Sequence, residues 1–180
     1  MRALLLALLL VACATPLSAQ EVRSSPELLA VEVARQAGQQ NWEAVANLTD
    51  PVELERLRAT FGRLLQLDPD PASLQLFGVA DVAGFLALDP RSILTTFLRI
   101  GSADAFGVEF VASTLLGVVR EEPDMAHAVL RQDLRFEGRA LSTAELISMR
   151  RGRDGWWART GPEMQGMLLG MESQFPAITE

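Results

Sequence analysis

The residues best suited to proton transfer fall in one stretch of the second half of the chain. His127 is the single histidine, and the carboxylates of Asp133 and Glu145 follow it. Because histidine changes its charge near neutral pH, His127 with Asp133 or Glu145 could act as a general base and its orienting partner. A strand histidine that bonds a neighbouring side chain accounts for the same residue, and we favour that interpretation.

Other side chains in this half could contact a ligand. Arg131, Asp133 and Arg135 alternate along the sequence, so on a strand they share one face and could clamp an anion. The alternative is a solvated strand face. Trp156 and Trp157 are adjacent and would point to opposite faces, one into the core and the other into a pocket or an interface. Arg131, Trp156 and Trp157 are therefore the candidate ligand-binding residues.

The composition excludes several reaction classes. All sixteen lysine-or-arginine positions are arginines, so neither a Schiff-base lysine nor a phosphate-loop lysine exists. The chain also has no tyrosine and no Gly-x-Ser-x-Gly motif. One histidine and one cysteine, Cys13, give no metal-binding spacing. We expect no cofactor and no metal.

The first residues have the pattern of an export signal. Arg2 precedes a short apolar run over residues 3–12, and small residues follow up to Ala19. This pattern predicts a signal peptide over residues 1–19 and a single exported domain over residues 20–180. The run is too short to span a bilayer and no later segment is long and apolar enough, so we expect no transmembrane span.

Two processing routes remain open at this end of the chain. Leu10-Val11-Ala12-Cys13 resembles a bacterial lipobox, in which Cys13 would be acylated and become the new N-terminus. Cys13 comes early for such a motif, so we favour simple cleavage. Simple cleavage predicts a periplasmic or secreted protein, whereas lipidation predicts a membrane-anchored lipoprotein.

Length, composition and charge favour one globular domain after the leader. The chain of 180 residues is 49% apolar and 22% charged, which is enough apolar material for a core. Its net charge of −7 disfavours contact with phosphate backbones. We therefore expect no nucleic-acid partner.

The first part of the domain has helical periodicity. Apolar residues recur at helical spacing from residue 25 to about residue 101. Three of these predicted helices begin with a capping side chain followed by proline, at Ser25-Pro26, Asp50-Pro51 and Asp89-Pro90. Glu53 stands where the glutamate of a capping box would lie.

The second part has strand periodicity. Residues 106–160 form alternating segments separated by short turns, with Asp154-Gly155 as a hairpin signal. Short turns between neighbouring strands predict an antiparallel meander. Residues 161–173 return to helical spacing, and Thr160 with Glu163 reads as a second capping box.

Apolar side chains indicate which faces are buried. In the second strand Ala126, Ala128 and Leu130 share one face, with Gln132 among them. The first strand, residues 106–120, is apolar on both faces and so needs cover on both sides. Helices would cover one side. Sheet curvature, a partner or the last helix would cover the other.

A stripe of flexible side chains marks the last predicted helix. Met164, Met167, Leu168 and Met171 recur at helical spacing. We expect this stripe to dock on the domain's own sheet. A homodimer or another protein partner is the alternative.

The pattern as a whole resembles the NTF2-like superfamily, an α+β cone. The resemblance lies in the opening helix followed by Gln40-Asn41-Trp42-Glu43-Ala44-Val45, in Leu48-Thr49-Asp50-Pro51, and in the Asp154-Gly155-Trp156 turn. Asn41 stands where family members usually have an acidic residue. The resemblance implies a cone whose open end holds a small apolar ligand, and it implies no particular activity because the superfamily mixes enzymes, binders and assembly modules.

These observations predict an α+β fold with N-terminal helices packed on a curved antiparallel C-terminal sheet. The function we expect first is non-enzymatic binding of a small apolar ligand or a partner protein by an exported domain. The second is a hydrolase- or isomerase-type enzyme that uses His127 with a carboxylate. The third is an envelope assembly module.

Overall fold

The computed structural model describes residues 18–102 and 107–173, so the expected leader and Cys13 lie outside the described residues. Its helices are α1 (Ala19–Val22), α2 (Pro26–Gly38), α3 (Trp42–Leu48), α4 (Pro51–Leu67), α5 (Pro71–Leu76), α6 (Val82–Leu86), α7 (Pro90–Ile100) and α8 (Pro162–Glu172). Its strands are β1 (Val108–Glu122), β2 (Met125–Phe136), β3 (Arg139–Gly152) and β4 (Gly155–Ala158). The protein is therefore α+β, as predicted.

Three capping residues predicted from the sequence do begin helices. The side chain of Ser25 accepts a backbone N–H from the first turn of α2. Asp50 does the same for α4 and Asp89 for α7. A proline follows each cap, at a position where its missing N–H costs no helical hydrogen bond. Local sequence thus determines where these helices begin.

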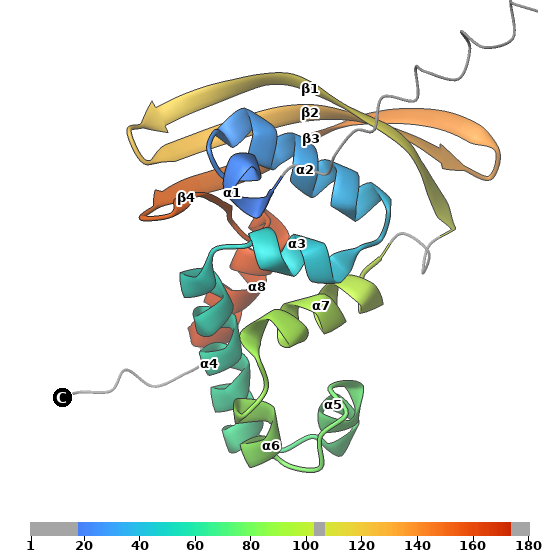
Figure 1. Ribbon diagram of the computed structural model, residues 1–180. Helices are drawn as coiled ribbons and strands as arrows, with labels where there is room; N and C mark the ends of the chain where they lie inside the picture. Colours follow the sequence, from blue (N-terminus) through green and yellow to red (C-terminus); the bar gives the residue numbers. More distant parts are fainter. Residues whose placement is uncertain (1–17, 103–106, 174–180) are drawn as a thin grey trace, which may run out of the picture.

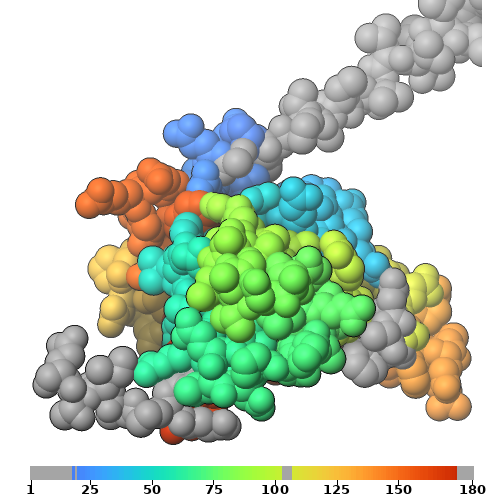
Figure 2. Space-filling view, turned by 90° about the horizontal axis from the view of Figure 1, so that it is seen from below, coloured from blue at the N-terminus to red at the C-terminus, as the bar shows by residue number. Residues whose placement is uncertain are grey.

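The four strands form the predicted antiparallel meander, in the order β1-β2-β3-β4. The sheet arches over the helices, with α2 directly beneath it and α4 to α7 farther away (Figure 1). Seen from the helical side, α4 to α7 form a continuous surface, and the ends of the strand hairpins protrude at both edges (Figure 2). None of the helices in the described part of the chain is both long and apolar enough to cross a membrane.

Buried side chains gather in two cores. The first core joins α2 to the inner face of the sheet and includes Leu29, Ala30, Ala126, Ala128, Leu130 and Met149. The second lies among the helices and includes Leu54, Leu57, Phe85, Ile93, Leu94 and Leu168. The inner face of β2 is therefore the one that alternation predicted, with Gln132 among its apolar residues.

β1 does not alternate as regularly as the sequence predicted. Its pairing with β2 shifts at three places: between Phe110 and Ala112, between Leu115 and Gly117, and between Arg120 and Glu122. Each bulge changes which residues face inward. Leu115 and Val118 pack on the first core, whereas Leu116 and Val119 are 59% and 63% exposed. The described residues do not cover that outer side, so the expected second cover of β1 is not found among them.

The last helix packs on other helices, so the prediction that its stripe docks on the sheet was wrong. Leu168 is buried in the second core. Near the end of α8, the carboxylate of Glu172 accepts hydrogen bonds from Nε and Nη2 of Arg56 at 2.8 and 2.6 Å and from the hydroxyl of Thr60 at 3.1 Å. Arg56 and Thr60 belong to α4, which is therefore the surface on which α8 docks.

The two predicted capping boxes were also wrong, for one shared reason. The carboxylate of Glu53 accepts hydrogen bonds from Nε of Arg159 at 2.5 Å and from the N–H and hydroxyl of Thr160 at 2.6 and 2.7 Å. Thr160 consequently does not cap α8, whose N-cap is Gly161 without a side-chain hydrogen bond. The end of β4 lies beside the first turn of α4, and a guanidinium is a stronger partner for a carboxylate than a neutral N–H.

Asp50 connects the helical layer to the sheet. Its carboxylate is 3% exposed and accepts a hydrogen bond from Nε of Arg150 in β3 at 2.7 Å. The same carboxylate caps α4, and the backbone N–H of Asp50 donates to the carbonyl of Ala158 in β4 at 2.8 Å. One residue thus holds a helix start, a strand end and an arginine in place.

Replacing Asp50 with alanine is expected to destabilise the protein by about 2–3 kcal/mol, because it removes a helix cap and the buried partner of an ion pair. The loss of stability should be at the lower end of the range for a broken ion pair, because Arg150 is 41% exposed and remains solvated without its partner. Asp89→Ala is the matched control, since Asp89 caps α7 through the same aspartate–proline geometry with an exposed carboxylate. Chemical unfolding that finds equal losses for the two variants would contradict the role given to Asp50.

Candidate functional site

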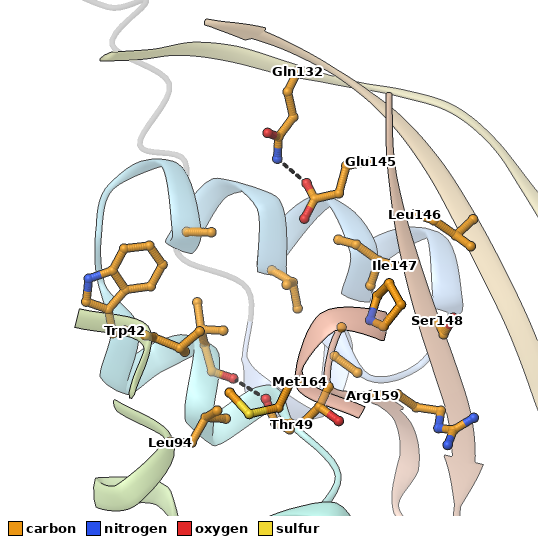
Figure 3. Close-up of a pocket in the computed structure, with 18 of the residues that line it drawn as sticks. Trp42, Thr49, Leu94, Gln132, Glu145, Leu146, Ile147, Ser148, Arg159 and Met164 are labelled. Carbon is orange, nitrogen blue, oxygen red and sulfur yellow. Dashed lines mark hydrogen bonds between the residues drawn. The ribbon is translucent and has the colours of Figure 1, made fainter. Parts of the chain in front are cut away.

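A cavity of about 500 Å³ lies between the inner face of the sheet and the helices (Figure 3). It is located where the two cores meet. Val33 and Ile147 on its wall belong to the first core, and Leu94 belongs to the second. Trp42 of α3 and Met164 of α8 line the side away from the arched sheet. Most of the lining is apolar, which suits a hydrophobic ligand.

One aromatic ring separates this cavity from a second hollow. The ring of Phe110 packs on Gly38 so closely that a Cβ added there would lie 2.2 Å from Cε1 of Phe110. Both residues line the main cavity, and both also line a hollow of about 450 Å³ between α2 and β1. The contact between Phe110 and Gly38 therefore sets one boundary of the cavity.

Two neighbouring strands form a polar end of the cavity. Gln132 of β2 donates a hydrogen bond through Nε2 to Oε2 of Glu145 in β3. Both side chains point into the cavity (Figure 3). Burial among apolar groups raises the pKa of the Glu145 carboxyl, and the negative charge of Glu163 raises it further. A carboxyl group that resists ionisation thus faces an apolar space.

The opposite, polar rim of the cavity carries a cation that is already paired. Arg159 lines the cavity but directs its Nε to Glu53, and its side chain extends away from Glu145 (Figure 3). Thr160 beside it donates its hydroxyl to the same carboxylate. The guanidinium therefore compensates Glu53 and not Glu145.

His127 lies on the outer face of the sheet. Its register partners are Val119 and Ser148, and its ring nitrogens Nδ1 and Nε2 lie 3.0 Å from Oγ of Ser148 and 2.9 Å from Oε2 of Glu121. Glu145 is paired in register with Leu130, whose side chain is buried on the inner face. The structure therefore brings His127 to a carboxylate, but on the far side of the sheet from Glu145.

Asp133 is not a partner of His127 either. It stands six positions farther along β2, which is about 20 Å in an extended strand. Its carboxylate accepts the hydroxyl of Ser142 at 2.5 Å and lies 3.5 Å from Nε of Arg131. The predicted grouping of His127, Asp133 and Glu145 is thus dispersed over two faces of the sheet.

The three candidate ligand-binding residues lie away from the cavity. Trp156 is buried in the first core and Trp157 is half-buried beneath the guanidinium of Arg23, whose Cζ is 4.2 Å from the ring centroid. The tryptophans face opposite ways, as predicted. Arg131 is exposed and bonded to its neighbour Asp133. None of the three lines either described cavity.

Sequence reasoning missed most of the residues that form the cavity. In the sequence, Trp42 stands out only within the segment that carries the family resemblance, and no pattern indicates that Arg159 lines a cavity. A signal did exist for Gln132, because a polar residue stood alone on an otherwise apolar strand face. Glu145 was selected as a partner for His127, and its place inside the cavity came from strand register that the sequence did not reveal.

The Phe110–Gly38 contact predicts an interaction between two substitutions. Gly38→Ala alone should cost about 1–2 kcal/mol, because its Cβ displaces the ring. In a Phe110→Ala background the same change should be neutral or stabilising by a few tenths of a kcal/mol, since alanine favours helix over glycine. A double-mutant cycle by chemical unfolding measures the difference, and an equal cost in both backgrounds would refute the contact.

Glu145→Gln is expected to stabilise the protein at neutral pH. The raised pKa of Glu145 means that folding is favoured while the carboxyl is protonated, and that this advantage is lost as the pH rises through the folded-state pKa. Glutamine removes the buried charge and can still bond Gln132. Urea midpoints across the acidic-to-neutral range should converge at acidic pH and separate above it. Glu137→Gln, in an exposed turn, is the control for loss of one charge.

Comparison with known proteins assigns this chain to no family. No family model and no curated protein matches it. Among solved structures, a SEC-C motif containing protein from Rhodopseudomonas palustris, determined in solution, matches with 16% sequence identity and a TM-score of 0.43 over 77% of this chain and 80% of that one. Likeness at this level transfers no property of that protein, so the function has to be inferred from the geometry of the cavity.

Proposed function

We propose that this protein is an exported, non-enzymatic binding domain that holds a small apolar ligand between α2, α3 and the sheet. The single observation that supports this is the cavity of about 500 Å³ with a mainly apolar lining. Small-molecule sites typically have volumes of about 300–1,000 Å³ and a few polar groups among apolar walls. Gln132 and Glu145 supply such polar groups here.

The NTF2-like resemblance supports the same proposal. That fold would place a ligand under an arched sheet, with helices as the opposite wall. The export part of the proposal rests on the leader over residues 1–19, which lies outside the described residues. Simple cleavage remains the favoured route, with lipidation at Cys13 as the alternative.

The enzyme alternative has weaker support. A reaction that used His127 would need a substrate site beside its ring, and neither described cavity is lined by His127. Its two side-chain hydrogen bonds, to Glu121 and Ser148, satisfy both ring nitrogens. This is the arrangement expected of a strand histidine that bonds its neighbours.

A protein partner is the second candidate function, and one observation favours it. Leu116, Val119 and Leu146 are each more than half exposed, and Val119 and Leu146 lie on the outer side of the sheet. Exposed apolar side chains that gather on one face mark interaction surfaces. A second copy of this chain or an envelope protein would both fit this role.

Filling the cavity tests the ligand proposal. Ala37→Trp places an indole in the space beneath the sheet and should weaken binding of the uncharged dye Nile red at least about tenfold, because the dye's site is occupied. Ala144→Trp is the matched control, since Ala144 is exposed on the outer face opposite Arg131. Dye fluorescence gives the affinity, and far-UV circular dichroism confirms that both variants fold. Equal binding by both variants would rule out this cavity as the site.

A further inference from the structure

The polar end of the cavity carries Glu145, a partly buried carboxylate that pairs with no cation among the described residues. Among the described residues, Glu145 accepts one hydrogen bond, from the neutral amide of Gln132. That bond engages Oε2 and leaves Oε1 for another donor. A buried ionised carboxylate is costly unless a positive group or several donors compensate it.

The charges that the structure describes around this end do not compensate Glu145. The group that shifts the pKa of Glu145 most after burial is Glu163 of α8, which carries the same sign. Glu163 curls back toward the cavity rim, where its Oε2 is 3.3 Å from the Cβ position of Gly161. The nearest lining guanidinium, on Arg159, is engaged by Glu53 at 2.5 Å. The electrostatic balance of the cavity is therefore negative.

From this arrangement we propose that the ligand is an amphiphilic cation: an apolar chain or ring system whose protonated amine binds the free oxygen of Glu145. The inference rests on the proposed function and specifies its ligand class. The apolar part of the ligand lies against Trp42, Leu94 and Met164, and its ammonium group reaches the Gln132–Glu145 pair. Gln132 acts as a positioning residue, because it holds the carboxylate toward the cavity.

The same arrangement rejects anionic amphiphiles. A fatty-acid carboxylate at this end would meet Glu145 and the negative charge of Glu163, while Arg159, the arginine among the described lining residues, is engaged by Glu53. An uncharged alcohol would gain one hydrogen bond and no ion pair. A protonated amine gains a charge-assisted hydrogen bond, which is roughly twice as strong as a neutral one.

Three ligands of equal chain length that differ in their head group test the proposal: decylamine, decanol and decanoate. Each is added to the full domain with Nile red bound, and displacement of the dye is measured. At neutral pH, decylamine should displace the dye at about tenfold lower concentration than decanol, with decanoate weakest. Glu145→Gln should bring decylamine and decanol within about twofold of each other. Asp133→Asn, which removes an acidic charge on the outer face, should leave the order and the affinities unchanged.

Acidification supplies an independent readout. Decylamine binding should weaken as Glu145 becomes protonated, and its raised pKa places this loss above the ordinary range for glutamate. Among the described residues, Glu163 on α8 is the charged group that acts on Glu145, whereas Arg159, which follows β4, turns away to pair with Glu53 on α4. Glu163→Gln should therefore move the loss to lower pH, whereas decanol binding should not change with pH.

The outcomes separate this inference from the proposed function. If Nile red binds and all three ligands displace it equally, or decanoate is preferred, the cation assignment is overturned while the cavity remains the binding site. If Nile red and all three ligands fail to bind, both proposals fall. If decylamine binds Ala37→Trp as well as the unchanged protein, it adheres to the acidic surface and the assignment is also overturned.

Discussion

The connection between Asp50 and Arg150 is the constraint on which the arrangement of the two layers depends. Asp50 ends the link from α3 and begins α4, while Arg150 lies near the end of β3. The backbone of Asp50 also bonds Ala158, and Thr49 forms a parallel bridge with the same residue. These contacts join the start of α4 to β3 and β4. The cavity lies where the two cores meet.

Much of the fold could be predicted because its signals are local. Aspartate or serine followed by proline specifies a helix start within a few residues, and Asp154-Gly155 specifies a tight turn between two strands. Alternation along β2 correctly identified its inner face. The failures at Glu53 and Thr160 have a different origin. Each residue has a sequence pattern that fits a cap, but tertiary structure brings Arg159 beside Glu53, and a charged partner replaces the local one.

The candidate site was less accessible to sequence reasoning, because strand register decides which residues meet. Glu145 and Gln132 are thirteen positions apart and share a face only through the pairing of β2 with β3. His127 was expected to meet Asp133 or Glu145, yet alternation sends it to the outer face with Glu121 and Ser148. A lone histidine draws attention by its chemistry, whereas a glutamine within an apolar strand face is easily overlooked. In this protein that glutamine, Gln132, lines the cavity, whereas the histidine does not.

The bulges of β1 have a consequence for how the protein behaves in a crowded solution. β1 is an edge strand of 15 residues, and an uninterrupted edge of that length could recruit strands from other molecules and seed fibrils. Its three register shifts break the row of unpaired backbone groups into short, twisted pieces that a flat incoming strand cannot follow. The opposite edge consists of the four residues of β4, where Thr49 bridges Ala158, and of the part of β3 before Met149, which pairs with no further strand among the described residues. Irregular pairing thus makes the β1 edge a poor template for strands of other molecules.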